Sequence, residues 1–247
     1  MASGTTPTPT ALLHSVELEA RALAAELSEP EPLVVGPRLA LTGMLEGVPV
    51  LMLATGMGKT NAAQALTSLL EHHPVRGVLN FGVGGAYPGA RLGVAEVALA
   101  TSEIYGDEGV AAPTGWIGTE GIGIPLLERE EQRWFDEFPL DAELVERALQ
   151  AVRAEGMPCQ SGPFVTVSAC SGTGARGREL EERHGAICES MEGAALAHVC
   201  TLYEVPFLEV RGISNAVEDR DLSRWRLREA ADVACRAARA LVRAQLF

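Results

Sequence analysis

Two glutamates stand in otherwise apolar surroundings, where a carboxylate could do chemistry. Glu19 follows the run ALLHSV and lies in the first turn of a predicted helix, while Glu192, in CESMEGAALAHVC, opens a predicted helix of small residues. Either carboxylate could simply favour the positive end of its helix dipole. Beside a bound ligand, the same group could instead take a proton from water or accept hydrogen bonds from hydroxyl groups.

A third group of polar residues ends a strongly apolar segment. The sequence FLEVRGISNAVEDRD places Arg211, Ser214 and Asn215 at the end of a predicted strand. Asparagine often ends a strand as a turn residue. An arginine and an asparagine together favour a binding site, because open α/β sheets bind their ligands at the carboxyl edge of the strands.

Two glycine-rich motifs resemble nucleotide-binding loops but lack residues that those loops need. The motif GMGKT (56–60) has Leu53 where the phosphate-binding loop requires a glycine, and GVGG (82–85) has Tyr87 in place of the third glycine of the dinucleotide fingerprint. The second motif still indicates a strand end that a ligand can approach closely, at Val83 and Gly84.

The elements that must position these groups follow from hydropathy and turn residues. Apolar runs bounded by glycine and proline alternate with segments of helical period, which is typical of an α/β protein. We predict strands over residues 11–16, 39–44, 48–54, 77–81, 94–102, 164–168 and 206–213. We predict helices over residues 17–27, 58–71, 142–155, 174–183, 191–203 and 224–245.

Two segments break this alternation. Residues 105–139 are rich in glycine, proline and acidic residues and have no clear period, so we predict a long excursion that covers a ligand. Residues 1–10 have neither a basic cluster nor an apolar run, so we expect a flexible polar tail instead of a signal peptide. Residues 11–247 are expected to form one domain.

Composition limits the partners of the chain. Its 247 residues are 47% hydrophobic and carry a formal net charge of −13, which opposes binding to a polyanion such as nucleic acid. No segment is long and apolar enough to span a bilayer. The five cysteines are scattered and form no CxxC pair, which favours reduced thiols in the cytoplasm and no metal site. We therefore expect a small-molecule ligand, with no metal or cofactor.

The combination of GMGK, NFGVGGA, SMEGAALAHVC and VRGISNAVEDRD resembles the purine nucleoside phosphorylase/nucleosidase superfamily. Within it, the chain is most similar to the branch of methylthioadenosine/S-adenosylhomocysteine nucleosidases and futalosine hydrolases, over nearly the whole length outside the tail and residues 105–139. The resemblance implies a single-domain, three-layer α/β/α fold with a central mixed, twisted sheet, and a homo-oligomer, with a homodimer as the leading expectation. It also implies a nucleoside substrate whose N-glycosidic bond breaks through an oxocarbenium-like sugar.

The resemblance also implies roles for individual residues. Glu19 matches the acid that activates water in the nucleosidases, and Glu192 matches the carboxylate that binds the ribose hydroxyls, with Met191 packed against the sugar. Arg211 is expected to orient Glu19 or the water. Hexameric phosphorylases carry a phosphate-binding arginine in place of Glu19, and relatives of both kinds carry a serine in place of Val83. Both differences favour hydrolysis, because a carboxylate repels phosphate and valine has no hydroxyl to bind it.

Asn215 separates the substrate classes. Similar adenine-specific nucleosidases carry an aspartate that can protonate N7 of the leaving base, whereas the Asn215 amide offers neutral hydrogen bonds that suit N7 and O6 of a 6-oxopurine. The resemblance therefore implies hypoxanthine as the base and futalosine, in the futalosine route to menaquinone, as the substrate. Backbone groups at Cys170 and Ser171 would hold the base. Trp116 and Arg220 are candidates for binding the carboxyaryl-ketone arm on the 5′ side.

Three other functions remain open. Asn215 disfavours a methylthioadenosine/S-adenosylhomocysteine nucleosidase, and Glu19 with Val83 disfavours a phosphorylase. A non-catalytic nucleoside-binding homologue is disfavoured because Glu19 and Glu192 are both present.

Overall fold

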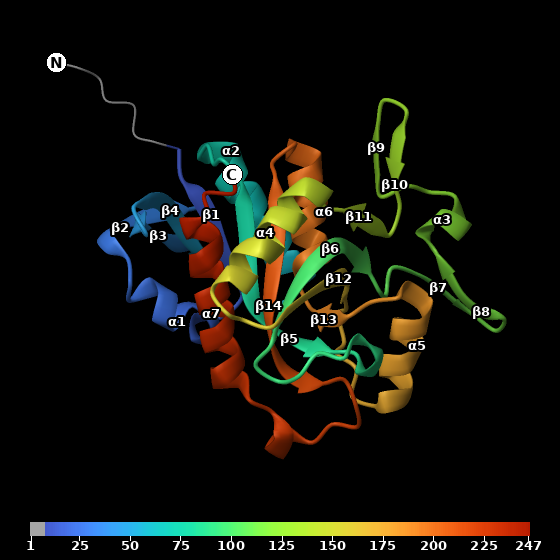
Figure 1. Cartoon of the computed structure of the whole chain (residues 1–247). Coiled ribbons are helices and arrows are strands. Elements are labelled where there is room, and N and C mark those ends of the chain that lie inside the picture. Colours follow the sequence, from blue (N-terminus) through green and yellow to red (C-terminus); the bar gives the residue numbers. More distant parts are fainter. Residues whose placement is uncertain (1–7) are drawn as a thin grey trace.

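A ten-stranded mixed sheet runs through residues 8–247, the part of the chain that the computed structural model describes (Figure 1). Its strands are β1 (Thr10–His14), β2 (Ser28–Val35), β3 (Arg38–Leu45), β4 (Val48–Ala54), β5 (Val78–Ala86), β6 (Val97–Tyr105), β11 (Glu137–Pro139), β12 (Cys159–Thr166), β13 (Cys188–Ser190) and β14 (Phe207–Ala216). Their spatial order is β11-β6-β12-β13-β5-β1-β4-β3-β2, and β14 pairs with both β5 and β6.

Five of these strands close into a ring. Strand β14 pairs in parallel with β5 and antiparallel with β6, β6 pairs with β12, β12 pairs with β13, and β13 returns to β5. Closed ladders leave no free edge between their members, so a strand of the ring cannot slip without breaking the pairing on both of its sides. The ring therefore fixes the register of the strands that end nearest the predicted site.

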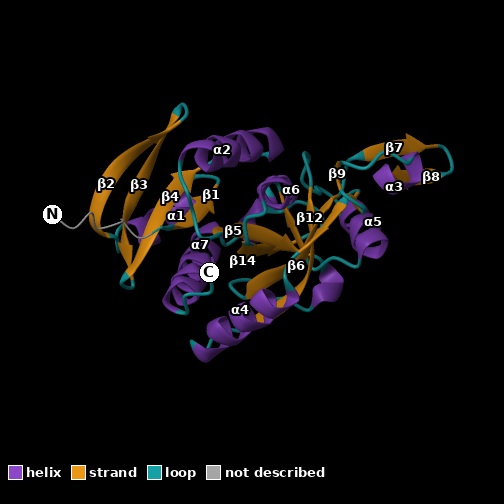
Figure 2. Ribbon diagram, turned by 90° about the horizontal axis from the view of Figure 1, so that it is seen from above, coloured by secondary structure: helices purple, strands orange, loops and turns teal. Residues whose placement is uncertain are grey.

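Helices cover both faces of the sheet (Figure 2). They are α1 (Glu17–Ala24), α2 (Lys59–His72), α4 (Ala142–Ala154), α5 (Gly174–His184), α6 (Gly193–Tyr203) and α7 (Leu227–Arg243). Helices α1, α4 and α7 pack on one face around Leu12, Leu79 and Phe81, and α2 and α6 pack on the other around Leu13 and Leu53. These layers confirm the predicted α/β class and the three-layer α/β/α arrangement.

Every predicted strand and helix is present, although several strands are longer than predicted. Three sheet strands, β2, β11 and β13, are not predicted by the sequence pattern. The proline and glutamate residues of β2 are typical of a loop, but β2 lies at the edge of the sheet, where a missing N–H and exposed charges are tolerated. Strand β13 has three residues, too few for a periodic signal. Because α6 begins at Gly193, Met191 and Glu192 precede the helix instead of lying within it.

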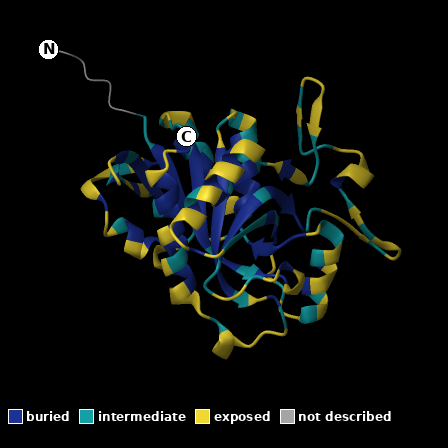
Figure 3. Ribbon diagram, viewed as in Figure 1, coloured by how far each residue is buried: buried dark blue, intermediate teal, exposed yellow. Residues whose placement is uncertain are grey.

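The segment 105–139 is ordered into small elements instead of one irregular excursion. They are β7 (Gly109–Ala112) paired with β8 (Gly115–Gly118), α3 (Thr119–Ile122), and β9 (Leu127–Arg129) paired with β10 (Gln132–Trp134). The two hairpins project beyond the sheet, and their tips are exposed (Figure 3). Strand β11 then returns the chain to the sheet beside β6.

The predicted tail over residues 1–10 falls mostly outside the described residues, and Thr10 already belongs to β1. From residue 8 to residue 247, no helix is long and apolar enough to cross a membrane.

Candidate active site

A cavity of about 390 Å³ lies where β5, β13 and β14 end, and this volume suits a small-molecule ligand. Its walls also include the loop after β1 and the segment that leads into α7. Eleven of the residues predicted for the site line this cavity: Glu19, Val83, Gly84, Cys170, Ser171, Met191, Glu192, Arg211, Ser214, Asn215 and Arg220. Residues as far apart in the sequence as Glu19 and Arg220 are thus brought to one place by the strand order.

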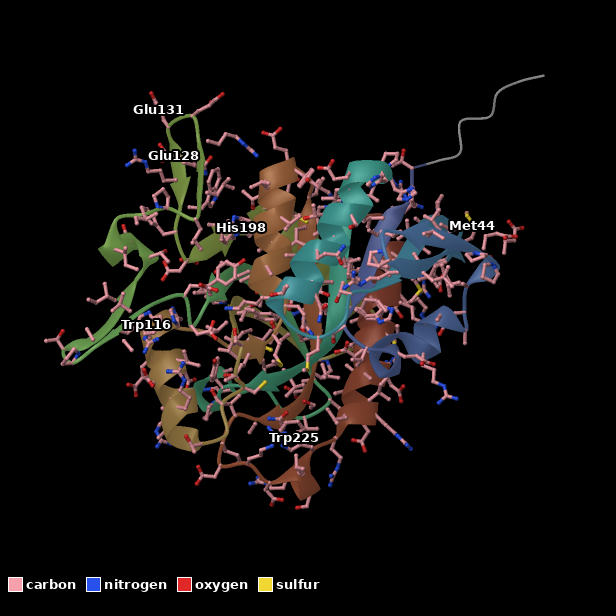
Figure 4. All side chains as sticks on the ribbon, turned by 180° about the vertical axis from the view of Figure 1, so that it is seen from behind. Met44, Trp116, Glu128, Glu131, His198 and Trp225 are labelled. Atoms are coloured by element: carbon pink, nitrogen blue, oxygen red, sulfur yellow. The ribbon has the colours of Figure 1, made fainter. Side chains whose placement is uncertain are left out.

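Trp116 is the exception, and its predicted contact with the substrate is not supported within this chain. It lies on β8, and the Arg183 guanidinium of α5 stacks over its ring at 4.8 Å. Figure 4 places Trp116 beside α5 and Trp225 on the separate segment before α7. Trp225, which the sequence pattern did not single out, lines the cavity and carries Arg220 over its ring at 4.6 Å. Among the described residues, no member of the segment 105–139 lines the cavity.

Glu19 is held by four donors at the start of α1. Its Oε2 accepts hydrogen bonds from the N–H and the hydroxyl of Ser15, at 2.9 and 2.5 Å, and from the N–H of Val16 at 3.1 Å. Its Oε1 accepts the N–H of Val83 at 2.9 Å, which ties the carboxylate to β5. Glu19 is only 2% exposed and still lines the cavity, so it caps its helix and faces the ligand space.

Glu192 is the N-cap residue of α6, but its side chain accepts no hydrogen bond from the N–H groups of that helix. Oε1 instead accepts the N–H of Gly58 at 2.9 Å, so the GMGK motif, which does not form a phosphate-binding loop, holds this carboxylate. Burial raises the pKa of Glu192, while the Arg211 charge and the Gly58 N–H oppose that rise. The carboxylate lies at the wall of the cavity, where hydroxyl donors of a ligand can reach it.

Arg211 joins the two glutamates. Its Nη2 lies 3.4 Å from Glu192 Oε2 and its Nη1 lies 3.8 Å from Glu19 Oε1, and the guanidinium is 2% exposed. Nη1 also donates to the carbonyl of Val83 at 3.1 Å. This close approach requires glycine at position 82, because a Cβ there would collide with Glu19 Oε1 and lie 2.9 Å from Arg211 Nη1.

Two further carboxyl groups lie behind Arg211, and the sequence analysis missed both. Glu209 Oε1 accepts the Nε–H of Arg211 at 2.7 Å, and Glu209 Oε2 accepts from the Asn80 amide at 2.7 Å. Glu103 is fully buried, and burial together with the Glu209 charge raises its pKa. The available signal was the pair Glu209 and Arg211, since residues two apart on a strand share a face.

Asn215 and the loop at Ser171 also line the cavity. The Ser214 hydroxyl donates to Asn215 Oδ1 at 2.7 Å, and Asn215 Nδ2 donates to the carbonyl of Ala216 at 2.9 Å. The backbone N–H of Ser171, predicted to hold a base, is already engaged, because it donates to Glu189 Oε1 at 2.8 Å. Glu189, a second glutamate of CESMEG, was not distinguished from Glu192 by the sequence pattern.

The charges of the site favour a bound group on which positive charge develops. Three glutamates, Glu19, Glu192 and Glu209, surround the single guanidinium of Arg211. Carboxylates fixed in a water-poor site stabilise positive charge that develops on a bound group, and they repel an anion such as phosphate.

Comparison with known proteins agrees with this geometry. Residues 9–246 match the model of the phosphorylase superfamily. The chain therefore belongs to the phosphorylase superfamily. Futalosine hydrolase of Thermus thermophilus is 36% identical over 220 residues, which are 89% of this chain and 91% of that protein. Futalosine hydrolase of Streptomyces coelicolor is 32% identical, with 87% of each chain covered.

A second group of relatives is nearly as similar. The 5′-methylthioadenosine/S-adenosylhomocysteine nucleosidase of Geobacillus thermodenitrificans is 29% identical over 86% of each chain. The solved structure of the Neisseria meningitidis nucleosidase with methylthio-immucillin-A shares the fold, with a TM-score of 0.82 and 22% identity over 96% of this chain and 99% of its own. Within the superfamily, the chain is a nucleoside N-glycosidase of the group that these nucleosidases and the futalosine hydrolases form.

Proposed function

We propose that this chain hydrolyses futalosine and releases hypoxanthine. The observation that carries the proposal is Asn215, a neutral amide that lines the same cavity as Glu19 and Glu192, in a chain 36% identical to a futalosine hydrolase. An amide can both accept and donate hydrogen bonds, which matches N7 and O6 of a 6-oxopurine. The other proposed product is futalosine without its hypoxanthine, which belongs to the futalosine route to menaquinone.

The acidic end of the cavity supports water as the nucleophile. Glu19 accepts the Val83 N–H and lies next to a valine side chain, which cannot hydrogen-bond a phosphate oxygen. In the proposed reaction, the C1′–N9 bond breaks and water oxygen bonds to C1′. Glu19 takes one proton from this water, and the purine takes a proton from solvent water as the bond breaks and leaves as neutral hypoxanthine. Glu19 then returns its proton to solvent, so that one water is consumed overall. Glu192 accepts the ribose hydroxyls and stabilises the cationic sugar, while Arg211 holds both carboxylates.

The 5′ arm of futalosine ends in a carboxylated aryl ketone, which needs an apolar wall and a cation. Trp225 and Leu227 supply the wall, and Arg220 supplies the cation over the Trp225 ring. We therefore retain Arg220 for the arm and propose Trp225 in place of Trp116. A covering role for residues 105–139 would act on the cavity of another copy, in the homodimer that we propose.

The alternative substrate class is adenine nucleosides, favoured by the 29% identity to a methylthioadenosine/S-adenosylhomocysteine nucleosidase. Replacement of Asn215 by aspartate is expected to raise the ratio of kcat/KM for methylthioadenosine over inosine by about tenfold or more, because an ionisable carboxyl can donate a proton to N7 of adenine. Steady-state base release measures the ratio. Asn61→Asp, at an exposed position on α2, is the matched control. An unchanged ratio would remove the main reason for choosing hypoxanthine.

The proposed activity is tested by incubating the purified protein with futalosine, inosine or methylthioadenosine, each with and without phosphate, and separating the released bases by chromatography. We expect hypoxanthine from futalosine at a rate that phosphate does not increase. Adenine from methylthioadenosine as the dominant product would assign the alternative function, and strict phosphate dependence would assign a phosphorylase.

A further inference from the structure

Glu189 is a buried carboxylate to which the reaction described above assigns no role. It lies on β13, is 6% exposed, and lines the cavity. Three donors converge on it. Ser171 donates its N–H to Oε1 at 2.8 Å and its hydroxyl to Oε2 at 2.6 Å, and the Tyr87 hydroxyl donates to Oε2 at 3.2 Å.

These contacts leave one acceptor position on the carboxylate. An ionised carboxylate has about four lone-pair sites, two on each oxygen. The two donors to Oε2 use its pair, and Ser171 N–H uses one site of Oε1. Among residues 8–247, no other hydrogen bond to Oε1 occurs, so a donor of the ligand can complete the set. The three internal donors also prevent Glu189 from rotating away.

The sheet register places Glu189 opposite Asn215. Gly85 of β5 is paired with Glu189 of β13 on one side and with Asn215 of β14 on the other. Register partners project from the same face, so both side chains stand over Gly85, on strands two spacings or about 10 Å apart. A Cβ at position 85 would lie 2.9 Å from Val217 Cγ2 and 3.4 Å from Asn215 Nδ2, so glycine keeps the floor between them open.

We infer that Glu189 accepts the N1–H of a 6-oxopurine and is the residue that selects this class of base over 6-aminopurines. Asn215 and Glu189 then bind opposite ends of one purine edge. In a 6-oxopurine, N1 carries a hydrogen and is a donor. In a 6-aminopurine, N1 is a bare acceptor, which would face a carboxylate that has no proton to offer. The inference rests on the proposed function only in that the cavity binds a purine.

The expected selectivity is large. An acceptor placed against the open position of a buried carboxylate loses a hydrogen bond and leaves part of the charge unsatisfied, which should weaken binding of the mismatched ligand by about 10- to 100-fold. Because the contact is present in the bound substrate as well as in the transition state, its loss should raise KM more than it lowers kcat.

Binding of the free bases tests the proposed role of Glu189 without any turnover. Calorimetric titration of the wild-type protein with hypoxanthine, 1-methylhypoxanthine and adenine is expected to give Kd values at least about tenfold higher for the second and third bases. Glu189→Gln is expected to weaken hypoxanthine about tenfold and to reduce the discrimination against 1-methylhypoxanthine. Glu182→Gln, an exposed position on α5, should change neither value.

Equal affinity of the wild type for hypoxanthine and 1-methylhypoxanthine would overturn the inference, and this arm needs no variant to fold. Unchanged hypoxanthine affinity in a folded Glu189→Gln variant would overturn it as well. The outcome is separate from that of the futalosine assay, because a protein that discriminates among the free bases but does not hydrolyse futalosine would contradict the proposed function alone.

Discussion

Replacement of Glu19 by glutamine is expected to lower kcat by about 100-fold or more. Glutamine keeps the size of the side chain but cannot take the proton of the attacking water. Its NH2 group must also stand among the donors Ser15, Val16 and Val83, which should cost about 1–3 kcal/mol of folding free energy. Turnover of futalosine and thermal unfolding, measured on the same preparation, separate the two effects.

Glu17→Gln is the matched control for this change. Glu17 lies in the same first turn of α1, but it is exposed and does not line the cavity. A helix-dipole role alone would give the two variants similar, small effects. A Glu19→Gln enzyme that turns over like the wild type would show that Glu19 only caps its helix.

Glu192→Gln is expected to lower kcat by a similar factor, about 100-fold, because a neutral amide stabilises a cationic sugar far less than a carboxylate does. The amide oxygen can still accept the Gly58 N–H, so the fold should be retained. Substrates with and without the ribose 2′-hydroxyl distinguish the role. Removal of that hydroxyl should slow the wild type strongly and the variant much less.

Glu143→Gln provides the control, since Glu143 is an exposed acid in the first turn of α4. If the deoxy substrate is penalised equally in the wild type and in Glu192→Gln, the assignment of Glu192 to the ribose hydroxyls is wrong, whatever the size of the loss in kcat.

Local sequence patterns predicted the residues that end or begin an element. Glu19, Glu192 and Asn215 stand near such positions, Arg211 interrupts the apolar run of β14, and the structure brings all four to one cavity. The class of fold was predictable for the same reason, because the alternation of strand and helix periods extends along most of the chain.

The missed residues acquire their neighbours through long-range register, although the spacing of Glu209 and Arg211 was a local sign that their side chains share one face of a strand. In the sequence, Glu209 is an isolated charge in an apolar strand, and only the structure shows that it accepts a hydrogen bond from Arg211. Glu189 acquires its neighbours through the pairing of β13 with β5 at Gly85. The position of Trp116 away from the cavity of its own chain depends on the same long-range packing. Its segment is long and glycine-rich like many covering loops, but the Trp116 ring lies against α5, at 4.8 Å from the Arg183 guanidinium.

The closed ring of β5, β14, β6, β12 and β13 has a consequence for the entropy of substrate binding. Side chains carried on these strands, Arg211, Glu209 and Glu189, lose their conformational freedom when the chain folds, since each strand is paired on both sides. Little ordering of this part of the site is left for the moment when a nucleoside arrives. Affinity is then set by the complementarity of the purine and ribose to a rigid surface, and less by rearrangement of the protein.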